Sequence, residues 1–196
     1  MALTPTPWGY DAENLEPLVD VETYRALSGS AASDEQIEAA LSAASSLVRT
    51  YCGWHVSPVV ECEAVMTARS AVLRLPALRV EDDSVAVAEN GIELENGTDF
   101  ECRREGLIRK TCGHWTTKWG GITVDYSAGI PEAPDLSRVC VQLTANSLSP
   151  MGVSQESAGG VSISYNKDSS GQGGSLSLTE SMRAALDPYK LPAGAW

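Results

Sequence analysis

The chain has little positive charge. Of its 196 residues, 14 are Lys or Arg and 26 are Asp or Glu, which gives a net charge of −12. A protein that grips nucleic acid by its phosphates, or that binds an anionic membrane surface, needs an excess of Lys and Arg. The composition therefore argues against both of these classes.

Long hydrophobic runs are also missing. No stretch reaches 18 apolar residues, so we expect no transmembrane helix and no membrane partner. Residues 1–10 have neither the cationic nor the apolar region of a signal peptide, so we expect synthesis in the cytoplasm. Hydrophobic residues nevertheless make up 43% of the chain, enough to bury the core of an ordinary globular domain.

The usual catalytic motifs are absent. The sequence contains no phosphate-binding Gly-x-x-x-x-Gly-Lys-Ser/Thr loop and no Gly-x-Ser-x-Gly turn. A thiol nucleophile would have to pair Cys112 with His55, or Cys62 with either His55 or His114, and nothing in the sequence specifies an orienting acid. We therefore expect no enzyme, no catalytic residue and no cofactor, and a thiol-dependent enzyme is the least favoured alternative.

The cysteines follow neither a disulfide nor a zinc pattern. Their number is odd and no Cys-x-x-Cys pair occurs, so we expect small apolar fillers and no metal site. Cys112 and His114 could share one face of a strand, and Cys102 and Cys112 could face each other across a hairpin. The five are Cys52, Cys62, Cys102, Cys112 and Cys140.

Two tryptophans close to a lysine admit two interpretations. Trp115 and Trp119, with Lys118 between them, could stack on bases, but more often such residues near Gly120-Gly121 pack a turn against a sheet. We expect the packing role.

Helix signals are clearest near the two ends of the chain. Asp20 is placed to cap a helix over 21–27, which Ser28-Gly29 ends. Ser33 and Gln36 form a capping box ahead of an amphipathic helix that stops at Gly53. A third helix should begin at Pro134-Asp135 and end near position 149.

The middle of the chain is rich in β-branched residues and turn dipeptides. Asn-Gly and Glu-Gly pairs at 90–91, 96–97 and 105–106 favour tight turns. Strands are predicted over 56–67, 70–75, 85–88, 92–94, 100–102, 107–110 and 122–126. This spacing indicates a small antiparallel sheet or sandwich.

These patterns predict an α+β fold, namely a small helical bundle with an inserted antiparallel β-sheet or sandwich and a flexible C-terminal docking tail. The tail contains a predicted lone strand at 161–165, a Ser/Gly-rich stretch at 166–175 and a capped helix at 179–186. The predicted parts are an extended arm over 1–19, a body over 20–150 and the tail over 151–196. Within the body we expect helices at 20–28, 34–52 and 132–148 and the β-rich insert at 54–127.

The order of these elements resembles the head–tail connector proteins of long-tailed bacteriophages, also called head-completion or adaptor proteins. The similarity covers roughly residues 18–150 and departs from the family in the long tail. Its motifs are Tyr51-Cys52-Gly53 after the second helix, the Leu-Pro exit at 75–80, the hairpin run at 90–94, 99–100 and 106–108, and the strand, turn and helix start at 124–129 and 134–136.

The resemblance implies a structural virion protein of the neck. Such proteins form a homo-oligomeric ring, commonly twelvefold, beneath the portal protein, where they extend the DNA channel and receive a stopper or tail-completion protein. Genomic DNA would pass through without specific binding. A tail terminator or a stopper remains the alternative.

The resemblance also suggests which residues act. In relatives the C-terminal segment docks on the portal, and deleting 176–196 here should then leave the fold intact while abolishing attachment. By position, the docking candidates are Val161, Ile163, Tyr165, Leu176, Leu178, Met182, Leu186, Tyr189 and Leu191. The acidic helix start offers channel-facing candidates, since negative charge weakly repels phosphate: Asp34, Glu35 and Glu38.

Overall fold

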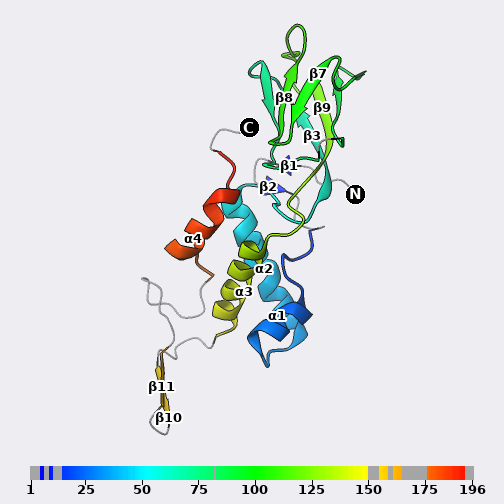
Figure 1. Cartoon of the computed structure of the whole chain (residues 1–196). Coiled ribbons are helices and arrows are strands. Elements are labelled where there is room, and N and C mark those ends of the chain that lie inside the picture. The colour runs from blue at the N-terminus through cyan, green and yellow to red at the C-terminus, as the bar shows by residue number, and fades with distance from the viewer. Residues whose placement is uncertain are drawn as a thin grey trace. The chain divides into compact units, whose positions relative to one another are not determined.

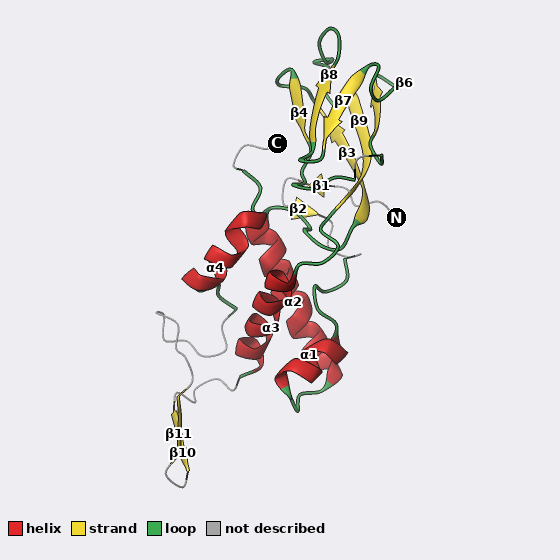
Figure 2. Cartoon of the chain, viewed as in Figure 1, coloured by secondary structure: helices red, strands yellow, loops and turns green. Residues whose placement is uncertain are grey.

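The chain divides into two compact units (Figure 1). The β unit comprises Met1–Leu15, Arg49–Ala133 and Tyr189–Trp196, and the helical unit comprises Glu16–Val48 and Pro134–Pro188. The computed structural model describes residues 5–6, 9–10, 15–81, 83–149, 155–158, 161–164 and 176–192. It combines helices with antiparallel sheets, so the α+β class is confirmed (Figure 2).

The helical unit contains α1 (Val21–Ser28), most of α2 (Asp34–Cys52), α3 (Pro134–Leu148) and α4 (Glu180–Leu186). The apolar stripes of these helices form its core. The buried side chains include Tyr24 of α1, Ile37, Leu41, Ala44 and Val48 of α2, Leu136, Val139, Cys140 and Leu143 of α3, and Met182 and Leu186 of α4. Ser45 Oγ of α2 and Cys140 Sγ of α3 lie 3.4 Å apart inside this core.

Local capping fixes the first helix as the sequence predicts. Asp20 accepts a hydrogen bond from the Thr23 amide, and Gly29 adopts a φ of 63° while its amide donates to the Arg25 carbonyl. Only glycine enters this left-handed region without steric cost, so the helix ends there. The end of the predicted arm is also anchored, because the Leu18 amide donates to Ser45 Oγ.

The β unit contains two main antiparallel sheets. The first has the order β3-β9-β5-β6, from Val60–Met66, Ile122–Ala128, Ala86–Glu89 and Ile92–Leu94. The second has the order β4-β8-β7, from Val72–Arg74, Leu107–Lys110 and Phe100–Arg103. Asn90 and Gly91 close the β5–β6 hairpin with φ values of 53° and 81°, as the Asn-Gly pair predicts.

Alternation along β9 places the core of this unit. Ile122, Val124, Tyr126 and Ala128 are buried, whereas the residues between them are partly or fully exposed. The first predicted strand starts late, at Val60, because Val56 has a φ of 65° and Pro58 has no amide hydrogen to give to a ladder.

Two short ribbons complete the described residues. β1 (Pro5–Thr6) pairs with β2 (Gly9–Tyr10), and β10 (Gln155–Ala158) pairs with β11 (Val161–Ser164). The prediction of a lone strand at 161–165 was therefore wrong. Its partner, Gln-Glu-Ser-Ala, has no apolar alternation by which a strand could be recognised. A 3-10 turn, Asp187–Tyr189, follows α4. Within the described ranges, no helix has the length and apolarity needed to cross a bilayer.

Candidate functional site

The last described segment, residues 176–192, holds most of the predicted docking residues. Thr179 caps α4 by accepting a hydrogen bond from the Met182 amide at 3.3 Å. Met182 and Leu186 then point into the helical unit, where they are 6% and 0% exposed. These two side chains are part of the chain's own core.

The end of this segment returns to the β unit. Trp54 Nε1 donates to the Tyr189 carbonyl at 2.7 Å, and the Leu191 amide donates to the Cys52 carbonyl at 2.8 Å. Lys190 Nζ lies 4.7 Å from the centre of the Tyr51 ring. Leu191 is 7% exposed, so it too is covered within the chain.

The remaining docking candidates lie in different surroundings. Leu178 and Tyr189 are half-buried and Leu176 is 37% exposed. Val161 and Ile163 lie on strand β11, and Tyr165 lies outside the described residues. Residues 176–192 are thus a packed part of the tail.

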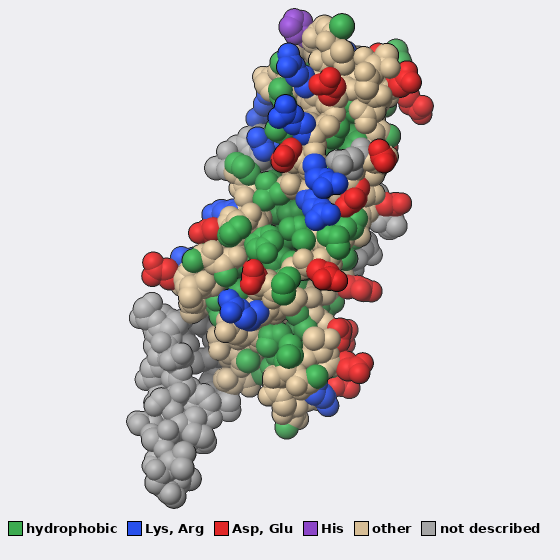
Figure 3. Space-filling model, viewed as in Figure 1, with side chains coloured by type: hydrophobic (Ala, Val, Ile, Leu, Met, Phe, Trp, Pro, Cys, Tyr) green, Lys and Arg blue, Asp and Glu red, His purple; other side chains and the backbone are tan. Residues whose placement is uncertain are grey.

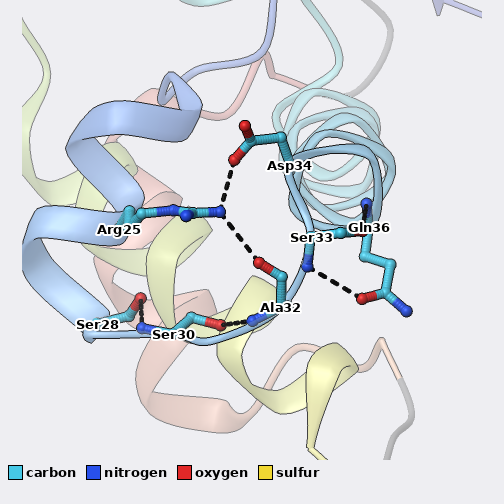
Figure 4. A network of polar contacts seen from close by, with 7 residues as sticks. All are labelled: Arg25, Ser28, Ser30, Ala32, Ser33, Asp34 and Gln36. Atoms are coloured by element: carbon cyan, nitrogen blue, oxygen red, sulfur yellow. Dashed lines mark hydrogen bonds and ion pairs between the residues drawn. The ribbon is translucent and has the colours of Figure 1, made fainter.

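The acidic helix start is built around a hydrogen-bonded turn between α1 and α2 (Figure 4). The Arg25 guanidinium donates to the Ala32 carbonyl at 3.0 Å and to Asp34 Oδ1 at 2.5 Å. Ser33 and Gln36 form both bonds of the predicted capping box, at 3.3 and 3.2 Å. Asp34 therefore has a cationic partner.

The other two acidic candidates present their charge to solvent. Glu35 and Glu38 are exposed, and their spacing of three residues puts them on one side of α2. Carboxylates in the first turn also favour the helix, because its N-terminus carries partial positive charge. Helix stability alone accounts for Glu35, whereas Glu38 lies beyond the first turn.

His55 has a structural position in the β unit. Its Nε2 lies 2.8 Å from the Ala128 carbonyl and 3.1 Å from the Pro58 carbonyl, and since carbonyls only accept, this nitrogen donates. Burial lowers the pKa of His55 to about 4, despite the opposing effect of the Ala128 carbonyl. Cys112 is exposed and His55 fully buried, so the proposed Cys112–His55 pair is not formed.

The other cysteines lie in different surroundings. Burial raises the pKa of Cys62 to about 12, so this thiol stays protonated at neutral pH. Cys102 lies opposite Ile108 in the β7–β8 register, so it does not face Cys112. Cys112 and His114 follow the end of β8 and are separated by Gly113 at a φ of 76°, so they share no strand face.

The two tryptophans of the 111–121 loop differ. Trp115 is 5% exposed and donates from Nε1 to the Ala71 carbonyl at 3.2 Å, which is the packing role expected for both. Trp119 is 91% exposed, so for this residue the expectation was wrong. Because Gly120 donates its amide to Thr67 Oγ1 and turns the chain at a φ of 61°, Trp119 is held at the outside of the turn.

Similarity to known proteins adds nothing to these positions. No protein-family model and no curated protein matches the chain. Among the residues whose placement is described, no cluster of three or more His, Cys, Asp and Glu side chains could hold a metal ion. Any assignment of function therefore depends on the elements and surfaces of the chain itself.

The sequence missed two features with functional potential. One is the exposed Trp119, whose exposure depends on the turn at Gly120. The other is the opposite charge of the outer faces of the two sheets in the β unit. Which side chains lie on these faces depends on strand register. The alternation of β9 was a visible signal for the second feature, but its partner strands could not be assigned from sequence.

Proposed function

We propose that this chain is a structural virion protein, a head–tail connector or adaptor that forms a ring under the portal and joins the capsid to the tail. The observation that carries the proposal is the order of its elements. A helical unit made of α1, α2, α3 and α4 is interrupted in sequence by a β-rich insert, and a further segment follows α3. This is the order in which connector proteins are built, with a small helical bundle, an inserted antiparallel sandwich and a docking tail.

The charge of the helical unit supports a role beside passing DNA. Its residues include 11 Asp or Glu and 4 Lys or Arg, a net of −7, against −5 in the β unit. Glu35 and Glu38 are exposed on α2. A negative surface repels phosphate weakly, which suits a channel that DNA crosses without being held.

The β10–β11 hairpin is the part of the tail best suited to contact the portal. Met182, Leu186 and Leu191 are already covered by the chain itself, so using them would require their removal from a core. We therefore assign the portal contact to Val161 and Ile163 of strand β11. In this proposal the protein lies in the neck of the virion, between the portal and a stopper or tail-completion protein.

The decisive experiment mixes the purified protein with the portal ring of the same virus. Negative-stain microscopy should show an added ring below the portal. The double variant Val161→Ser and Ile163→Ser should lose attachment, whereas the control Ser162→Ala and Ser164→Ala on the same strand should keep it.

A chain that ignores the portal at micromolar concentration would overturn the proposal. Density located away from the portal in a virion map would indicate a terminator or stopper instead.

A further inference from the structure

The exposed face of the four-stranded sheet is acidic. Its nine solvent-facing positions alternate with the buried residues of the same strands, and four of them are carboxylates while none is Lys or Arg. We call it the acidic face: Glu61, Glu63 and Val65 of β3, Thr123, Asp125 and Ser127 of β9, Ala86 and Ala88 of β5, and Glu93 of β6.

The exposed face of the three-stranded sheet has the opposite charge. Three of its six solvent-facing positions are arginines and one is a glutamate. We call it the basic face: Val72 and Arg74 of β4, Leu107 and Arg109 of β8, and Glu101 and Arg103 of β7. The register places Leu107 between Arg74 and Arg103, so two guanidiniums flank an apolar side chain.

The two faces point away from each other. Lys110 Nζ of β8 donates to Glu89 Oε2 of β5, and both side chains lie on the buried sides of their sheets, 19% and 13% exposed. Lys110 is opposite Phe100 and Glu89 is opposite Ile122, both fully buried. The buried sides therefore meet at this pair. Figure 3 shows Lys and Arg side chains gathered over β4 and β8, with Asp and Glu along the other edge.

The two faces carry features that are unfavourable in an isolated chain, namely a pair of like charges and exposed apolar side chains. Glu63 lies directly opposite Asp125 in the β3–β9 ladder, and like charges in that position destabilise a sheet. Each face also exposes an apolar side chain, Val65 at 60% and Val72 at 39%. A Cβ on Gly120 would lie 3.3 Å from Val65 Cγ1, so the exposed Trp119 stands next to the acidic face.

We infer that the acidic face of one copy docks on the basic face of a second copy of this chain. The contact pairs carboxylates with guanidiniums around apolar centres, and Trp119 provides an aromatic ring for which arginine is a favoured partner. Because the two faces differ and point apart, the contact is head-to-tail and extends from copy to copy until a ring closes. The closure of this contact into a ring rests on the proposed function. The contact between two copies can be measured with the purified protein alone.

The test uses two charge-reversed variants of the full chain. The acidic-face variant carries Glu63→Lys and Asp125→Lys, and the basic-face variant carries Arg74→Glu and Arg103→Glu. The first pair of changes brings the net charge of the acidic face from −4 to zero, and the second brings that of the basic face from +2 to −2. Each variant therefore loses the attraction between unlike faces and should self-associate at least about tenfold more weakly than the wild type. An equimolar mixture of the two variants gives one contact between unaltered faces and one in which the new lysines meet the new glutamates, so it should recover association.

Sedimentation velocity over a concentration series gives the readout. The wild type should associate at low salt and dissociate at about 1 M salt, where the screening length is about 3 Å. The control variants make the same charge changes in other exposed places, with Glu22→Lys and Glu132→Lys for one and Arg138→Glu and Arg183→Glu for the other, and should associate as the wild type does. Circular dichroism verifies that every variant is folded.

Two results would overturn the inference. One is a wild type that stays monomeric at low salt, or a mixture that fails to recover association. The other is a monomer that binds duplex DNA through Arg74 and Arg103, which would make the basic face a polyanion site. Portal binding, measured in parallel, separates the two proposals: a monomer that still attaches to the portal removes only the head-to-tail contact, and an oligomer that ignores the portal removes only the connector function.

Discussion

The hydrogen bonds within the helical unit and those within the β unit differ in the sequence separation of the residues they join. In the helical unit, capping and turn bonds join residues three to nine positions apart, as in Asp20–Thr23, Ser33–Gln36 and Arg25–Asp34. In the β unit, the buried bonds span 73 positions from His55 to Ala128 and 135 from Trp54 to Tyr189. Local sequence can therefore specify the helices of the first unit, although their packing also joins distant residues, as at Ser45 and Cys140. The strands of the second unit depend on partners that only the folded chain brings together.

Two spectroscopic signals of the chain, tryptophan fluorescence and helical circular dichroism, can test this comparison. The three tryptophans that the structure describes, Trp54, Trp115 and Trp119, belong to the β unit. Tryptophan fluorescence therefore follows the β unit, while circular dichroism at the helix band is dominated by the helical unit. Two probes that report different transitions show separate unfolding, and coincident transitions show that the units unfold together.

The largest expected effect of a single substitution comes from the core of the helical unit. Leu186→Ala removes a fully buried side chain of α4 and should lower the free energy of unfolding by about 3 kcal/mol. Urea denaturation followed by circular dichroism measures the loss. The control Leu176→Ala alters a 37% exposed side chain and should change stability far less.

Deletion of residues 176–196 should have a larger effect of the same kind. It removes Met182, Leu186 and Leu191 together, three buried side chains. The expectation that this deletion leaves the fold intact is therefore not supported by the packing. A truncated chain as stable as the wild type would mean that these contacts contribute little.

The helical unit could largely be predicted from sequence. The first two helices start and end within a residue of their predicted positions, because caps such as Ser33 with Gln36 are local signals. The strands were found, but their partners were not: nothing local shows that β9 lies between β3 and β5. The burial of Met182 and Leu186 was missed for the same reason, since a short amphipathic helix does not show which surface it packs on.

The next largest loss of stability is expected from breaking a buried ion pair of the β unit. Lys110→Met leaves the Glu89 carboxylate, which is 13% exposed, without its cationic partner while the Thr116 amide still donates to it at 2.5 Å, and should cost about 3 kcal/mol. The double variant Glu89→Met and Lys110→Met should recover much of that loss, because it leaves no buried charge. Fluorescence-detected denaturation measures both variants.

The matched control lies in the helical unit. Arg25→Met breaks the Arg25–Asp34 pair, whose side chains are 46% and 75% exposed, and should cost about 0.5 kcal/mol. Equal costs for the buried and the exposed pair would contradict the difference between the units.

His55 predicts how the β unit responds to pH. The folded chain holds the pKa of this histidine at about 4, below its ordinary 6.5, so the unfolded chain binds the proton more readily between these values. This contribution to stability is intact above pH 6.5 and is lost as pH falls toward 4, by about 3 kcal/mol in total. The variant His55→Gln keeps a donor without titrating, so its stability should vary less over this range. An unchanged pH profile would show that His55 is not responsible.

The smallest expected effect tests whether the capping box matters once tertiary packing is in place. Ser33→Ala removes the oxygen that accepts from the Gln36 amide at 3.3 Å, and the loss of such a cap costs about 1 kcal/mol. Ser46→Ala, at an exposed position inside α2, is the control and should be neutral or slightly stabilising, because alanine is the better helix former. Circular dichroism should detect the loss in Ser33→Ala while fluorescence detects less of it, if the units unfold separately. Equal shifts in both probes would instead mean that a local signal in α2 stabilises the β unit as well, and since α2 supplies the β unit with Arg49–Cys52, that coupling would run through the helix itself.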